Sequence, residues 1–199
     1  MNFFKIRFLI VLLIIQGCVF TKNHTITDTD LVDSWIELSL EITKTTPANS
    51  PTFASRCFGY FGLTMYESVV HGNPVFQTLD GQLKEFENIP KPDSNLVYQW
   101  HHVLNAAQAQ ILRLIYIQTS EHNKKLVDEL EKKNRRRINY TYGTKFDVTE
   151  SYLYGREVAE AIFEWSKKDG GHRGYLRNFD KSFQGRECEG CWGPALFSQ

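Results

Sequence analysis

The sequence lacks several features that define common protein classes. Each absence argues against one kind of fold or one kind of partner. Only four cysteines occur in 199 residues, and a chain of this length can bury a core without disulfide staples. Lysine plus arginine equal aspartate plus glutamate at 23 each, so the net charge of zero gives no indication of a nucleic-acid partner. No Glu-x-x-His pair is present, which excludes a di-iron helical bundle.

Two structural patterns are missing as well. No alternation of apolar and polar residues is long enough to predict a convincing strand. No repeat with a period of about 20–50 residues holds along the chain, which argues against a solenoid. What remains is an ordinary globular composition, 42% hydrophobic and 23% charged, in which helical periodicity dominates. We therefore predict an all-α fold, a bundle of about five helices with an irregular C-terminal tail.

The N-terminus has the features of an export signal. Lys5 and Arg7 precede the apolar run Phe8–Ile15, which is shorter than the roughly 20 residues of a membrane-spanning helix. We predict a signal peptide over residues 1–17. The four residues that end at Cys18, IQGC, resemble a bacterial lipobox, in which the cysteine after the cleavage site receives lipid. The alternative is an ordinary secretory signal followed by an incidental cysteine.

A lipid on Cys18 would fix the location of the protein and one of its partners. Buried acyl chains, at about 0.8 kcal/mol per CH₂, would anchor it to a membrane of a bacterial cell envelope, on the periplasmic or cell-surface side. Residues 18–28 are expected to form a polar tether and residues 29–199 the helical domain. Loss of the leader leaves 21 basic and 23 acidic residues, so the mature chain also gives no indication of nucleic-acid binding.

Apolar periodicity and capping residues place the first two helices. The apolar residues of the first share one face: Leu31, Trp35, Leu38 and Ile42. Asp28 or Asp30 can cap its start. The second helix begins at the cap Ser50 and runs to Gly72. It is apolar on several faces and is predicted to be central, with Gly59 and Gly62 letting a neighbouring helix approach closely.

Three more helices are expected in the second half. The third covers about Asn95–Thr119, and the fourth runs from the cap Ser120 to about Arg137. Asn139–Asp147 is predicted to be a turn region. The fifth helix starts at Thr149 or Ser151 and ends at Asp169. From Gly170 onward the chain is irregular, and the bundle looks incomplete at its C-terminal end.

Three of the histidines stand where a chemical role is conceivable. His172 follows a predicted helix end and two glycines, an arrangement that would suit a catalytic group. Its favoured role is structural, because Gly170 or Gly171 can supply the left-handed residue that ends a helix. Adjacent side chains on a helix point about 100° apart, so the neighbours His101 and His102 cannot easily share an ion.

The pair Glu67 and His71 and three of the cysteines can also be explained by structural roles. Glu67 and His71 are four residues apart and could touch, although a histidine near a helix C-terminus needs no partner. Cys188 and Cys191 form a lone C-x-x-C, which is equally compatible with a local disulfide and with two unrelated cysteines. Cys57 is expected to be a buried small apolar residue.

The basic run Lys132–Arg137 follows three acidic residues near the predicted end of the fourth helix. Cations in a last turn complement the helix dipole, so a solvated helix end is the favoured interpretation. Contact with anionic lipid headgroups is the alternative if the protein lies on a membrane.

Three segments together resemble the N-terminal half of bacterial vanadium-dependent haloperoxidases, which share a superfamily with type 2 phosphatidic-acid phosphatases. They are Ala54–Gly72, with its Tyr-Glu pair, the alanine-rich Trp100–Tyr116, and Gly155–Gly170, with Gly-x-x-Val-Ala and a trailing Asp-Gly. The resemblance covers nearly all of the expected mature chain. It implies an all-α fold that binds vanadate or phosphate in its C-terminal half, for peroxide-driven halide oxidation or phosphomonoester hydrolysis.

The family's oxyanion-binding elements are absent from this sequence. No lysine has an arginine seven residues later, and neither Arg-Pro nor Ser-Gly occurs. Ser55-Arg56 begins like another family element, but Gly62 stands where its histidine would be. We therefore assign no catalytic, cofactor-binding or metal-binding residue here, and vanadate is implied only for a full-length relative.

The resulting hypothesis is a lipid-anchored N-terminal portion of a haloperoxidase-like or phosphatase-like protein, truncated before its catalytic half and inactive alone. Its expected partners are the membrane and the missing C-terminal half or another protein surface. The alternative is a non-enzymatic helical envelope lipoprotein that binds a ligand or a partner.

Overall fold

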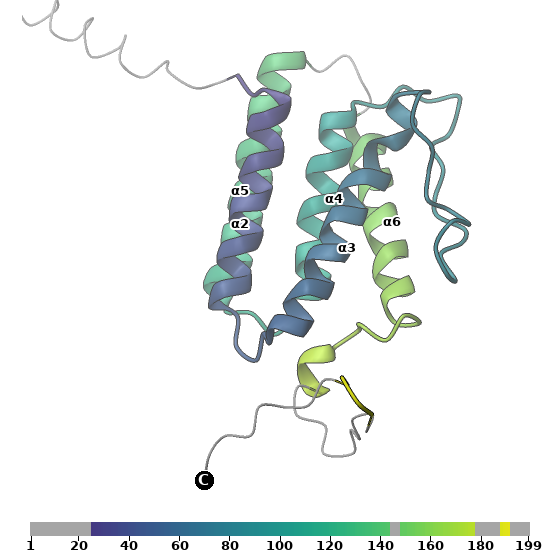
Figure 1. Cartoon of the computed structure of the whole chain (residues 1–199). Helices are drawn as coiled ribbons and strands as arrows, with labels where there is room; N and C mark the ends of the chain where they lie inside the picture. The colour runs from purple at the N-terminus through teal and green to yellow at the C-terminus, as the bar shows by residue number, and fades with distance from the viewer. Residues whose placement is uncertain (1–24, 144–147, 178–187, 192–199) are drawn as a thin grey trace, which may run out of the picture.

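The computed structural model describes residues 25–143, 148–177 and 188–191, and within these ranges it contains helices and no strand (Figure 1). The helices are α2 (Asp28–Thr45), α3 (Pro51–Val69), α4 (Trp100–Ile115), α5 (Glu121–Tyr142) and α6 (Val148–Ser166), with the 3-10 turns η2 (Val70–Gly72) and η3 (Gly174–Arg177). The predicted all-α fold is confirmed. A search of the described helices finds none that is both long and apolar enough to cross a membrane.

Helix α4 is the centre of the fold, and the prediction that α3 is central was wrong. Figure 1 shows α3 and α6 beside α4, and α2 paired with α5 on another side of it. Twelve of the 16 residues of α4 are buried, among them Ala106, Ala107 and Ala109. Small side chains let other helices approach α4 from several directions. In contrast, α3 leaves Phe58 and two glycines exposed.

The glycine that brings two helices together is Gly155 in α6. A Cβ atom added there would lie 2.2 Å from the carbonyl oxygen of Val103 in α4, so the two backbones touch. Around an added Cβ at Gly59 or Gly62, the described residues place no atom within 4 Å. No helix of the described residues makes the predicted close approach at these two glycines, and within those residues Gly155 performs this role.

The capping serines were predicted correctly, whereas the first helix is capped differently. Ser50 and Ser120 cap α3 and α5 as expected. The cap of α2 is Thr27, whose hydroxyl accepts from Asp30 N–H while the Asp30 carboxylate accepts from Thr27 N–H. This reciprocal capping box satisfies two backbone donors at once, which neither Asp28 nor Asp30 could do alone as a cap.

Other helix boundaries differ from the prediction as well, and α4 and α6 end at Ile115 and Ser166 instead of Thr119 and Asp169. Helix α4 begins only at Trp100, because the Gln99 side chain caps it. Helix α5 extends to Tyr142, well into the predicted turn region, and ends at Gly143, whose φ of +76° suits glycine. Its basic run is therefore not in the last turn. Ser151 lies inside α6, buried, and its hydroxyl accepts from Gln99 N–H at 2.9 Å.

The end of the predicted tether belongs to the folded part. Ile26 is buried, and its N–H donates to Thr141 Oγ1 at 2.9 Å. Arg137 of α5 donates from two nitrogens to the carbonyl oxygen of Thr25. The fold therefore includes residues from Thr25, while the predicted signal peptide and Cys18 lie outside the described residues.

Candidate functional site at the end of helix α6

Asp169, just past the end of α6, is the polar centre of the site. Its Oδ2 atom lies 2.8 Å from Nη1 of Arg56, and its Oδ1 atom accepts from the Tyr60 hydroxyl at 2.6 Å. The same Oδ1 accepts from Gly171 N–H at 2.9 Å. Arg56 and Tyr60 are four residues apart on α3, so they present adjacent side chains on one face. Asp169 therefore ties the end of α6 to α3.

The chain reverses after Asp169 as the sequence predicts. Gly170 has a φ of +84°, the left-handed conformation of a helix-ending glycine, and His172 N–H donates to Ser166 O at 3.0 Å. Gly171 has a second function that the sequence did not reveal. A Cβ atom there would lie 1.6 Å from the Tyr60 hydroxyl oxygen, so only glycine lets the loop pass over this ring.

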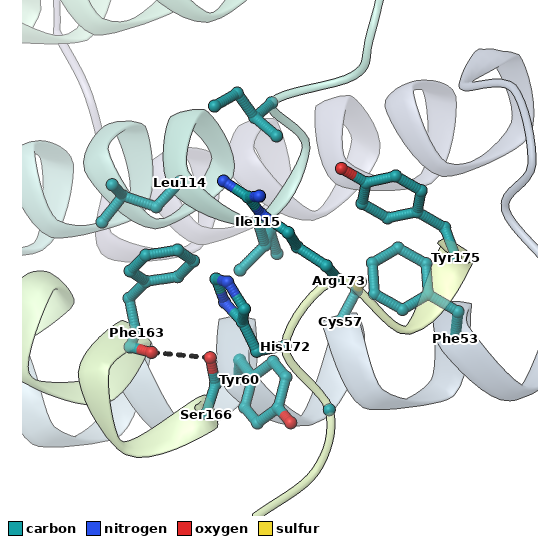
Figure 2. Close-up of a pocket in the computed structure, with 12 residues that line it drawn as sticks. Phe53, Cys57, Tyr60, Leu114, Ile115, Phe163, Ser166, His172, Arg173 and Tyr175 are labelled. Carbon is teal, nitrogen blue, oxygen red and sulfur yellow. Dashed lines mark hydrogen bonds between the residues drawn. The ribbon is translucent and has the colours of Figure 1, made fainter. Parts of the chain in front are cut away.

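His172 faces a small cavity between α3, α4 and α6, with room for one or two water molecules (Figure 2). The cavity has a volume of about 30 Å³. Its apolar lining includes Phe53, Ile115, Phe163 and Tyr175. The imidazole lies edge-on to the Phe163 ring, with centroids 5.1 Å apart, and its buried Nδ1 has no hydrogen-bond partner within the described part of the chain.

The groups around this cavity are poorly suited to proton transfer at neutral pH. Burial, and then the nearby positive charges of Arg173 and Lys167, lower the pKa of His172, which favours the neutral imidazole. Burial raises the pKa of the Cys57 thiol to about 12, so it stays protonated. Burial, and then the hydrogen bond to Asp169, raise the pKa of Tyr60 as well. The site can bind a small neutral guest more readily than it can activate a nucleophile.

The other predicted polar residues are separated from this site. Glu67 is buried, but it accepts from the Thr78 hydroxyl at 2.6 Å and from Leu79 N–H at 2.7 Å, and so fixes the loop after α3. His71 is exposed and does not make the contact with Glu67 that the spacing allowed.

The adjacent histidines have different partners, as the helix geometry predicts. The Nε2 atom of His101 lies 2.7 Å from the Asp28 carboxylate, and its ring stacks on Tyr142. His102 is buried in α4 and contacts Asn139 at 2.8 Å. The two rings therefore serve the contact of α4 with α2 and α5.

The structure decides between the two alternatives for the cysteine pair. Cys188 and Cys191 are joined by a disulfide, and Cys57 is free and buried as expected. Residues 178–187 and 192–199 of the predicted irregular tail lie outside the described residues.

The residues at this site do not fit the vanadate that the family resemblance implies. Arg56 is engaged by Asp169, and Arg177 donates to the carbonyl oxygens of His172 and Gly170. The cavity beside His172 is lined mainly by apolar side chains, and Arg173 is the one lysine or arginine of its lining, too little positive charge for an oxyanion with up to three negative charges. Across residues 25–143, 148–177 and 188–191, no group of three or more His, Cys, Asp or Glu side chains could hold a metal ion.

Comparison with known proteins gives one informative likeness. No protein-family model matches the chain, and no curated protein matches its sequence. The fold is similar to the crystal structure of a bacterial vanadium-dependent iodoperoxidase, with a TM-score of 0.56 and 21% sequence identity. The match covers 80% of this chain and 35% of the iodoperoxidase. The chain thus has a fold like part of that enzyme and spans about a third of its length.

Proposed function

We propose that this chain is a lipid-anchored helical scaffold of a haloperoxidase-like or phosphatase-like envelope protein, inactive without an oxyanion-binding segment that lies outside it. The fold likeness to part of an iodoperoxidase carries the proposal. Two observations support the view that the oxyanion-binding residues lie in a segment outside this chain. The family's oxyanion-binding elements do not occur in this sequence, and Arg56 and Arg177 near the end of α6 already have partners.

The open face of α3 is where we expect a helix of that outside segment to pack. A groove of about 480 Å³ runs along this face, lined by Ser55, Gly59, Leu63, Leu83 and Trp165, with Arg56, Tyr60 and Asp169 at one end. Gly59 leaves part of the groove without a side chain, and Gly62 and Phe58 are exposed on the same helix, Phe58 by 37%. The occupant to which we commit is an amphipathic helix of the segment that completes the match to the longer iodoperoxidase.

An activity assay tests the proposal. The purified chain is incubated with vanadate, hydrogen peroxide and iodide or bromide, and separately with a phosphomonoester. We expect rates equal to those without protein. Vanadate-dependent halide oxidation by the chain alone would refute the proposal. If the DNA downstream of codon 199 encodes Lys…Arg-Pro and Pro-Ser-Gly-His in any frame, the outside segment was once part of the same protein.

The lipid anchor is tested separately. Cys18→Ala should release the protein from membranes that have been washed with high salt, because a lipidated cysteine holds the protein there independently of charge. A Cys18→Ala protein that remains in the washed membrane fraction would contradict the lipid anchor and leave the scaffold proposal untouched.

The second candidate is a binding module that never had a catalytic half. The unpartnered Nδ1 of His172 beside an apolar cavity favours it. Under the scaffold proposal the open face of α3 exposes apolar surface and should bind a hydrophobic dye. A well-folded monomer with no affinity for the dye would favour the binding module.

A further inference from the structure

The outer face of α5 is strongly basic. Four of its five exposed lysines and arginines, here called the basic face, are Lys125, Lys132, Lys133 and Arg136, and the fifth, Arg135, lies to one side of them. A helix turns by about 100° per residue, which places all four on the side opposite the buried Val127, Asn134 and Ile138. Glu129 is the one acidic side chain that the same turn angle places among them.

The cations of the basic face are unpaired, in contrast to Lys124 and Arg137 of the same helix. Within the described ranges, no carboxylate lies within ion-pair distance of any of these four residues. Acidic residues of the same helix are neutralised elsewhere, because Arg113 of α4 pairs with both Asp128 and Glu131. Arg137, the next residue along, is turned inward and pairs with Asp30. The positive charge of the face is therefore available to an outside partner.

The position of the basic face relates it to the predicted anchor. Arg137 binds the carbonyl oxygen of Thr25, so the chain enters the fold beside Arg136, and Figure 1 shows α2 beginning at the end of the bundle where α5 finishes. Cys18 precedes Thr25 by seven residues, which span at most about 25 Å. A lipid on Cys18 would therefore hold the basic face close to the membrane surface.

An exposed aromatic residue extends the face toward that end. Tyr140 is 66% exposed, and the helical turn places it on the same side of α5 as Lys133 and Arg136. Tyrosine is enriched at membrane–water interfaces, where its ring lies among headgroups while its hydroxyl stays in contact with water. A duplex nucleic acid would use the cations and gain little from this ring.

We propose that the basic face of α5 contacts anionic phospholipid headgroups and orients the helical domain on the membrane. The proposal rests on the envelope location that is part of the proposed function, and it holds whether or not Cys18 carries a lipid. Each cation near an anionic surface adds a favourable interaction that decays over a Debye length, so the binding is sensitive to salt and to lipid charge.

The test uses the chain from residue 19 onward, which keeps every described residue and lacks the predicted lipid site. Its binding is measured by co-sedimentation with vesicles of phosphatidylcholine in which about a third of the lipid is phosphatidylglycerol, and with pure phosphatidylcholine vesicles. We expect binding to the anionic vesicles only, and loss of that binding at high salt. Lys125→Gln/Lys132→Gln/Lys133→Gln/Arg136→Gln should weaken it by about tenfold or more.

The matched control removes four exposed cations elsewhere: Lys44→Gln/Lys84→Gln/Lys91→Gln/Lys168→Gln. It has the same net charge as the face variant, and its binding should stay within about twofold of the unchanged chain. Equal loss in both variants, equal binding to neutral vesicles, or binding to duplex DNA but not to vesicles would each overturn the proposal. Because no lipid is attached in this test, its failure is distinguishable from failure of the Cys18 anchor.

Discussion

The contact between α4 and α6 and the outer face of α3 both contain helical glycines, and the two regions use them in opposite ways. At Gly155 the backbone of α6 rests on the carbonyl oxygen of Val103, and a methyl group has no room. At Gly59 and Gly62 the space beside α3 is open for at least 4 Å with respect to the described residues. The first region is a finished internal contact. The second is a surface on which another helix could pack closely, and the described residues do not cover it.

This contrast shows why a glycine in a helix cannot be interpreted from its own helix alone. Glycine costs helix stability wherever it occurs, so each one needs a compensating gain. The gain at Gly155 is visible as contact between two helix backbones. We infer that the gain at Gly59 and Gly62 lies in the proposed contact with an outside helix.

The largest expected effect is that of Gly155→Ala. The new methyl group would collide with backbone atoms of α4, which cannot move like the end of a flexible side chain. We expect the free energy of unfolding to fall by about 3 kcal/mol, measured by denaturant titration. Gly62→Ala is the matched control, and similar losses in the two variants would remove the distinction between the two regions.

A smaller loss of stability is expected when the hydrogen bonds of Asp169, which tie the end of α6 to α3, are removed. Asp169→Ala leaves the Gly171 N–H and the Tyr60 hydroxyl without their acceptor at the end of the α3 groove. The cost should be about 1–3 kcal/mol of unfolding free energy. Glu164→Ala serves as the control, because this exposed residue pairs only with the exposed Lys167. A loss in the control as large as that at Asp169 would show that the link does not hold the helix end.

Substitutions on the open face of α3 are expected to stabilise the chain instead of destabilising it. Gly59→Ala and Gly62→Ala should each raise the free energy of unfolding by about 0.5–1 kcal/mol, because alanine is the better helix former and meets nothing. Thermal unfolding of the isolated chain measures the gain. If an outside helix packs here, the same substitutions should weaken that association. Destabilisation of the isolated chain would instead mean that the face is already covered.

The smallest effect concerns pH. Burial lowers the pKa of His102 in α4, so the unfolded chain binds this proton more readily than the folded one. The contribution of His102 to the unfolding free energy is therefore fully present above the ordinary histidine pKa of about 6.5, and it declines as the pH falls below that value. We expect His102→Gln to flatten this decline, measured as unfolding free energy against pH, whereas His122→Gln at an exposed position should leave it unchanged. Identical pH slopes for the two variants would contradict this assignment.

Much of the fold could be predicted from local signals. Ser50 and Ser120 precede their helices directly, and Gly170 follows α6 where a left-handed residue ends it. These features depend on a few neighbouring residues and are visible in the sequence. The capping box of Thr27 and Asp30 was missed, although a Thr three residues before an Asp is a local signal that could have identified it.

What could not be predicted depends on contacts between distant segments. The apolar side chains of α3 suggested that this helix is the central one. The central helix is α4, because its alanines leave room for other helices on several sides. The roles of Gly155 and Gly171 depend on Val103 and on Tyr60, which are far away in sequence. Likewise, no local pattern shows that Asp169 meets Arg56 and Tyr60, so the candidate site emerged only from the tertiary structure.

The central claim, that this chain is a scaffold without an oxyanion site of its own, is tested most directly by titrating vanadate into the purified chain in a calorimeter. The account predicts no saturable heat, because Arg56 and Arg177 already have partners and the small His172 cavity has Arg173 as the one lysine or arginine of its lining. Saturable binding of one vanadate per chain, abolished by Arg56→Gln or His172→Gln, would contradict it.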